Sequence, residues 1–182
     1  MSLAQFAFYG ALVAIVLVCA AHVPKEQRGA AVLAAGIFAA NWLIYVSAWT
    51  YTLTGHDISA WALANSLGIK VSDEAIWAYA DALAATAIVL TCYKNWWGFA
   101  IWALYTLQIY VHYERSFAAT DFGFYAYSLD LLFMAMVAVF ILIGGKGVSD
   151  HVYRIVGDLH VRGLRGLRGA LQRAEAGKVD EP

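Results

Sequence analysis

Long apolar segments with few charged residues constrain this chain more than any other feature of its sequence. Over 182 residues, 62% are hydrophobic and only 14% are charged, whereas soluble domains are about 25% charged. A helix needs roughly 20 apolar residues to cross a bilayer core about 30 Å thick. We therefore predict an all-α integral membrane protein, a bundle of five transmembrane helices. Their predicted ranges are 6–22, 30–52, 74–93, 96–113 and 122–144.

The distribution of basic residues predicts the orientation of this bundle. Ten of the twelve Lys and Arg residues follow the first, third or fifth segment, and only Lys70 and Arg115 lie on the opposite side. Because cytoplasmic loops carry the excess of Lys and Arg, we expect the N-terminus outside and the C-terminus in the cytoplasm. Residues 53–73 then form an extracytoplasmic loop, with a short interfacial helix over 59–67. We expect the membrane to be a prokaryotic inner membrane.

A cytoplasmic tail of residues 146–182 follows the predicted bundle of residues 1–145. Its apolar residues recur at roughly helical spacing, and its repeat "GLRGLRGA" carries no aromatic residue. We expect a basic amphipathic helix that lies on anionic inner-leaflet lipids, disordered at its end and without affinity for nucleic acid. The predicted membrane-surface residues are Arg154, Arg162, Arg165, Arg168 and Arg173.

Two carboxylates interrupt the apolar segments, Asp81 in the third and Asp130 in the fifth. An ionisable side chain at the bilayer centre costs about 2.5–3.5 kcal/mol on insertion scales, so it marks a functional site or a partner. At a rise of 1.5 Å per residue, Asp81 lies roughly 10 Å and Asp130 roughly 13 Å from the outer ends of their helices. We therefore expect both carboxylates in one layer of the outer half of the membrane.

Other polar side chains are predicted to converge on this layer. The fourth segment carries three of them at spacings of three and four, which places them on one helical face. The inner halves of the same segments are almost purely apolar. The sequence thus predicts a polar cavity that opens to the outside and is closed below. The predicted ion-, proton- or ligand-binding residues are Asn41, Tyr45, Asp81, Tyr105, Gln108, His112, Tyr127 and Asp130.

Three chemistries fit such a cluster. The carboxylates could bind a cation through their oxygens. Two close carboxylates cannot easily both ionise, so the pair could also exchange a proton. A transition metal is the third option, with Asp81, His112 and Asp130 as its ligands. Each polar side chain could instead serve only as a hydrogen-bonding partner of a neighbouring helix.

No signature of an enzyme accompanies these residues. The sequence contains no GxSxG, HExxH or GxGD motif, so we assign no catalytic residue and name no cofactor. Cys19 and Cys92 lie in apolar segments and form no CxxC pair, which favours a buried packing role.

We therefore predict transport or channel activity for an ion, a proton or a small solute. One alternative is a non-catalytic subunit or scaffold of a larger membrane assembly, including a phage-type pore protein. A second is a membrane enzyme or metal-binding protein that uses the Asp/His cluster. Small residues recur at four-residue spacing, as at Gly36 and Ala40, and such stripes allow helices to approach closely. We expect a homo-oligomer or a subunit of a larger complex.

Overall fold

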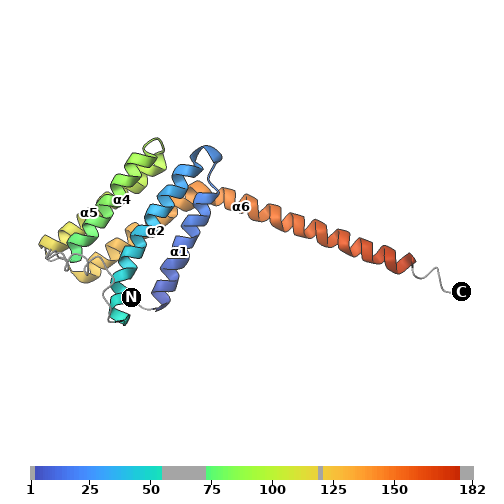
Figure 1. The fold of residues 1–182 in the computed structure, drawn as a ribbon, viewed down its shortest axis with the longest axis horizontal. Coiled ribbons are helices and arrows are strands. Elements are labelled where there is room, and N and C mark those ends of the chain that lie inside the picture. Colours follow the sequence, from blue (N-terminus) through green and yellow to red (C-terminus); the bar gives the residue numbers. More distant parts are fainter. Residues whose placement is uncertain (1–2, 55–72, 119–120, 177–182) are drawn as a thin grey trace.

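The computed structural model describes residues 3–54, 73–118 and 121–176. Within these residues the chain forms five helices and no strand, which confirms the all-helical class (Figure 1). The predicted interfacial helix over 59–67 lies outside the described residues. The helices are α1 (Leu3–Ala21), α2 (Lys25–Thr54), α4 (Asp73–Cys92), α5 (Trp96–Ala118) and α6 (Phe122–Ala176).

Four helices of the described chain are long and apolar enough to cross a membrane. These stretches are Leu3–Ala21, Lys25–Val46, Ala75–Cys92 and Phe122–Val156. Helix α5 is less apolar, because Gln108 and His112 accompany several Trp and Tyr residues along it. The apolar helices are compatible with a membrane protein, and α5 supplies polar groups among them.

The five helices of the described chain pack in a closed cycle. Helix α1 contacts α2, α2 contacts α4, α4 contacts α5, α5 contacts α6, and α6 returns to α1. The interior of this cycle is apolar in the half nearer the short connections at 22–24 and 93–95. Its fully buried side chains include Val16, Ile88, Ile101, Met136 and Phe140.

The end of the bundle that holds both short connections is fixed by two hydrogen bonds. The Trp97 indole Nε1 donates to Oε1 of Gln27 at 2.9 Å, and the Cys92 thiol donates to the Ala30 carbonyl at 3.6 Å. A Cβ on Gly98 would overlap the backbone of Cys92, so the tight turn into α5 requires glycine there. Both bonds tie the start of α2 to the turn between α4 and α5.

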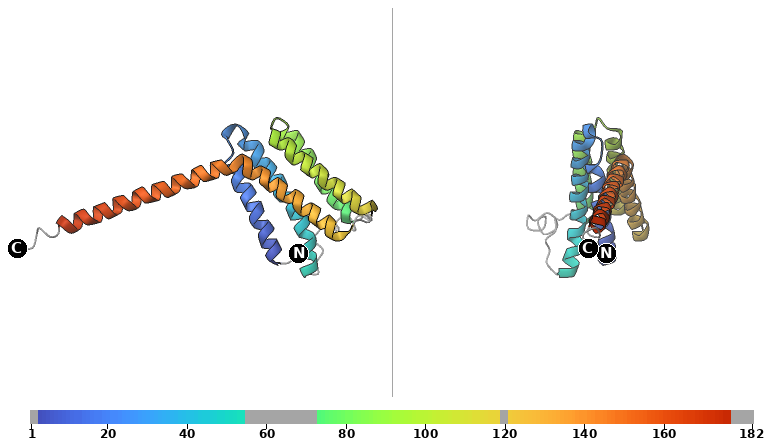
Figure 2. Two further views of the ribbon diagram at one scale, coloured as in Figure 1. Left: turned by 180° about the vertical axis from the view of Figure 1, so that it is seen from behind. Right: turned by 90° about the vertical axis from the view of Figure 1, so that its right-hand side faces the viewer.

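Helix α6 runs unbroken through the predicted boundary between bundle and tail, and it projects far beyond the other helices (Figure 2). The glycines near this boundary pack instead of ending the helix. A Cβ on Gly144 would overlap the carbonyl of Cys19, and one on Gly147 would overlap the carbonyl of His22. Glycine therefore lets the end of α1 lie directly against the α6 backbone. By contrast, a Cβ on Gly36 would meet nothing within 4 Å, so among the described residues Gly36 does not make the close helix contact predicted for it.

Candidate functional site

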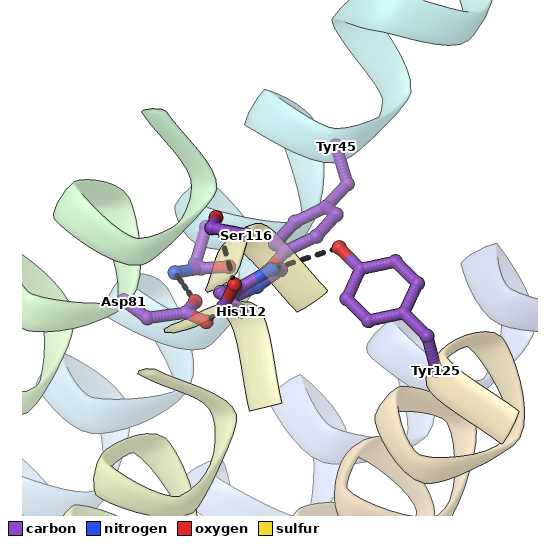
Figure 3. A network of polar contacts seen from close by, with 6 residues as sticks. Tyr45, Asp81, His112, Ser116 and Tyr125 are labelled. Carbon is purple, nitrogen blue, oxygen red and sulfur yellow. Dashed lines mark hydrogen bonds and ion pairs between the residues drawn. The ribbon is translucent and has the colours of Figure 1, made fainter. Parts of the chain in front are cut away.

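Asp81 lies inside the helix bundle, and none of its surface is exposed. Its Oδ1 accepts a hydrogen bond from Nδ2 of Asn41 at 2.9 Å, and its Oδ2 accepts one from the Tyr45 hydroxyl at 3.1 Å. Nε2 of His112 lies 3.2 Å from the same Oδ2. Helix α4 thus carries the carboxylate, while α2 and α5 supply the groups that occupy both of its oxygens (Figure 3).

His112 is also fully buried, and both of its ring nitrogens have partners. The Tyr45 hydroxyl lies 2.9 Å from Nε2, and the Tyr125 hydroxyl lies 2.8 Å from Nδ1. Figure 3 shows Tyr125 reaching toward this ring from α6. We call Asn41, Tyr45, Asp81, His112 and Tyr125 the buried network.

Two local features position the network. The Asp121 Oδ1 accepts hydrogen bonds from the backbone N–H groups of Gly123 at 2.9 Å and Phe124 at 3.1 Å. This N-cap fixes the first turn of α6, from which Tyr125 extends. The Trp77 ring lies 4.0 Å from the Tyr45 ring, centroid to centroid, so an aromatic contact between α4 and α2 holds Tyr45 in place.

Two further residues predicted from the sequence lie on the same face of α5. Gln108 is 6% exposed and Tyr105 is 1% exposed. The Tyr105 hydroxyl has no hydrogen-bonding partner among the described residues. Both lie between His112 and the start of α5 at the 93–95 connection, so polar groups end within the bundle and the apolar interior begins beyond them.

The structure does not bring Asp130 or Tyr127 to the buried network. Asp130 is exposed, and its Oδ1 accepts a hydrogen bond from the Tyr9 hydroxyl of α1 at 2.7 Å. Tyr127 is 66% exposed. Asp130 is five positions after Tyr125, which turns the side chains about 140° apart around the helix. The two carboxylates share an estimated depth, but Asp130 lies on another face of α6.

Asp130 also lies apart from the other two residues of the metal ligand set predicted from the sequence. Asp81 and His112 are in contact, but the third predicted ligand bonds elsewhere. No group of three or more His, Cys, Asp or Glu side chains within the described residues is arranged to hold a metal ion. The shared-proton hypothesis changes in the same way, because the partner of Asp81 is a histidine and not a second carboxylate.

Tyr125 is the network member that the sequence prediction missed. Its place near the end of a segment is typical of the aromatic belt at a membrane interface, and that pattern gives no reason to point it inward. The one available signal is Asp121, an N-cap residue four positions earlier, which predicts where α6 begins. Even so, the contact with His112 depends on how α5 and α6 pack.

A pocket of about 320 Å³ lies between α5 and α6 beside the network. Tyr125 belongs to both, because its side chain lines the pocket and its hydroxyl contacts His112. The Tyr125 hydroxyl therefore connects the pocket to His112 and, through that ring, to Asp81. Its lining residues are Tyr110, Val111, Glu114, Phe124, Tyr125 and Ser128.

This geometry allows the network to take up a proton without moving a heavy atom. In one arrangement His112 is neutral, its Nε2–H faces Asp81, and the Tyr125 hydroxyl donates to Nδ1. In the other the ring is an imidazolium, whose Nδ1–H donates to the Tyr125 oxygen. The Tyr45 hydroxyl can accept from Nε2–H while it donates to Oδ2 of Asp81.

Comparisons of the chain with protein-family models, with curated proteins and with solved structures found no match.

Proposed function

We propose that this protein is a small polytopic membrane protein whose buried network exchanges protons during transport or channel activity. The observation that carries the proposal is the contact of fully buried Asp81 with fully buried His112 inside an apolar bundle. Such pairs are costly in a membrane and mark proton relays and ion pathways. The transported species is a proton, or a small ion or solute whose movement is coupled to a proton.

The proposed orientation places the network in the outer half of the membrane. All five helices cross, with the N-terminus outside, and the basic residues Lys25, Arg28 and Lys94 face the cytoplasm, as the positive-inside rule requires. The α5–α6 pocket then opens toward the outer side. Protons enter at Tyr125, pass to Nδ1 of His112, and reach Asp81 through Nε2 or the Tyr45 hydroxyl.

The buried apolar side chains beyond Tyr105 act as a barrier in this proposal. Ile88, Ile101 and Phe140 have no exposed surface, and hydrocarbon without polar groups conducts no protons. Passage to the cytoplasm therefore requires the helices to rearrange around these side chains. Such a step would make transport slow and coupled to a conformational change, as in an alternating-access cycle.

Proton flux into proteoliposomes tests the proposal. We expect Asp81→Asn to lower the flux by about tenfold or more, because the amide cannot accept the proton. Asn has nearly the shape of Asp, so the variant is expected to fold. Asp130→Asn is the matched control, since it removes an exposed carboxylate outside the network. Equal flux in the wild type and in Asp81→Asn would contradict the proposal.

A second candidate function is that of a subunit in a larger membrane assembly. Helix α6 extends beyond the bundle, and its apolar side chains there include Val152, Ile155 and Val156, which are 52%, 46% and 57% exposed. An unpaired apolar face of this kind is suited to the inner leaflet or to another protein. The mass of the gently solubilised protein distinguishes a hetero-complex from a homo-oligomer.

A further inference from the structure

The pocket between α5 and α6 combines one carboxylate with three aromatic rings. Glu114 supplies the carboxylate, and Tyr110, Phe124 and Tyr125 supply the rings. Its volume of about 320 Å³ falls in the roughly 300–1,000 Å³ range of small-molecule sites. The buried network does not use Glu114, Tyr110 or Phe124, so their arrangement needs its own explanation.

The charges around the pocket favour a cation. None of the described lining residues is basic, and the Tyr110 hydroxyl holds the Glu114 Oε1 by a hydrogen bond of 2.5 Å. Arg115 does not line the pocket, and its guanidinium lies 5.9 Å from the Phe122 ring centroid. The first N–H groups of α6 would attract an anion, but the Asp121 carboxylate already accepts hydrogen bonds from two of them.

The aromatic walls narrow the class of cation. Ring faces attract ammonium groups, and aromatic cages recognise alkylated ammonium ions in particular. A metal ion needs several oxygen ligands, whereas these walls offer mainly carbon. We propose that the α5–α6 pocket binds an organic ammonium cation, with Glu114 as its counter-ion and Tyr110, Phe124 and Tyr125 as its aromatic walls.

Tyr125 connects this site to the buried network. A cation beside its ring lies next to the hydroxyl that contacts Nδ1 of His112, so cation binding is coupled to proton entry through Tyr125. This coupling rests on the proposed function, whereas the binding of the cation does not.

Two sources could supply the ammonium group. One is a soluble amine of the choline type, and the other is the headgroup of a choline or ethanolamine phospholipid in the outer leaflet. Both present the same chemistry to Glu114 and the rings. The lipid composition around the purified protein separates them.

The test is choline binding to the full chain in nanodiscs of phosphatidylglycerol, which carry no competing ammonium, measured by calorimetry. We expect Glu114→Gln to weaken binding by about tenfold or more, and Phe124→Leu to weaken it through loss of the ring. The matched controls are Glu26→Gln, an exposed carboxylate near the opposite end of the bundle, and Phe117→Leu, whose ring is 76% exposed on α5. Both controls should bind choline like the wild type.

The outcomes distinguish a soluble amine from a lipid headgroup, and an error in the pocket site from an error in the proposed function. Choline binding that Glu114→Gln weakens identifies a soluble amine. If choline does not bind, native mass spectrometry after purification from phosphatidylcholine or phosphatidylethanolamine should show retained lipid that Glu114→Gln loses. If neither choline nor lipid binds, or if Glu26→Gln loses binding as much as Glu114→Gln does, the proposed site is wrong. Unchanged proton flux in Asp81→Asn would instead overturn the proposed function. The pocket would remain testable, because choline binding can be measured in that variant.

Discussion

The Tyr45 hydroxyl lies 3.1 Å from Oδ2 of Asp81 and 2.9 Å from Nε2 of His112. It therefore bridges a carboxylate and an imidazole that are both fully buried. A buried polar group that loses its partner is costly, because no water replaces the lost hydrogen bond. At the scale of single residues, the stability of the bundle and the chemistry of the network thus depend on the same hydroxyl groups.

Tyr45→Phe removes this bridge and keeps the ring. We expect the free energy of unfolding to fall by about 1–3 kcal/mol, since both Asp81 and His112 lose a hydrogen-bonding partner. Reversible unfolding in mixed detergent measures the change. Tyr79→Phe is the control, because Tyr79 is 69% exposed on α4 and should leave stability unchanged. An unchanged free energy of unfolding in Tyr45→Phe would mean that the hydroxyl contributes little to stability.

Tyr125→Phe tests the role of the Tyr125 hydroxyl in proton entry without disturbing the fold. The ring stays to fill its place between α5 and α6, but Nδ1 of His112 loses its contact with the pocket. We expect proton flux to fall by about tenfold, while the unfolding transition shifts little because Tyr125 is only half-buried. Flux equal to the wild type would show that protons reach His112 by another route.

The buried face of α5 could be predicted from the sequence, but the face of α6 that carries Asp130 could not. The spacing along α5 placed Tyr105, Gln108 and His112 on one face, and all three are buried on it. Asp81 and Asp130 received similar depths from the helix rise, yet only Asp81 contacts His112. The rotation of α6 decides this, and it is set by packing between helices, which a single sequence does not reveal.

At the scale of elements, the start of helix α6 could be predicted from the sequence, whereas its end could not. Hydropathy predicted a helix from residue 122, and the structure begins α6 at Phe122. The prediction ended this apolar segment at residue 144 and began a separate tail at residue 146. The helix nevertheless continues, since Gly144 and Gly147 face the α1 backbone. Contacts between helices thus gave these glycines a role that local propensity opposes.

Gly144→Ala and Gly145→Ala should have opposite effects on stability. Alanine favours the helix by about 1 kcal/mol at either position. At Gly145 the nearest atom to an added Cβ is Ile141 Cγ2 at 3.5 Å, so that variant should be neutral or more stable. At Gly144 the Cβ would overlap the Cys19 carbonyl, and the forced separation of α1 and α6 should cost about 1–3 kcal/mol. Thermal unfolding in detergent compares the two, and equal melting temperatures would contradict the close contact.

At the scale of the whole molecule, α5 decides the topology. Five crossings place the two chain ends on opposite sides of the membrane, whereas four would place them on the same side. Four of the helices are apolar enough to span by composition alone, and α5 is the exception. Yet α5 packs between α4 and α6 in the closed cycle and carries His112 in its buried face. Partners on both sides make crossing favourable for a helix that lipid alone would accept poorly.

Labelling of single cysteines on either side of α5 tests this crossing. Lys94 is exposed in the connection before α5, and Phe122 is 66% exposed just after it. The native Cys19 and Cys92 are buried, so wild-type protein gives the low background. In intact cells, a membrane-impermeant maleimide should label Phe122→Cys but label Lys94→Cys only after permeabilisation. Equal labelling of both variants from one side would mean that α5 does not cross, and a reversed pattern would mean that the bundle is inverted.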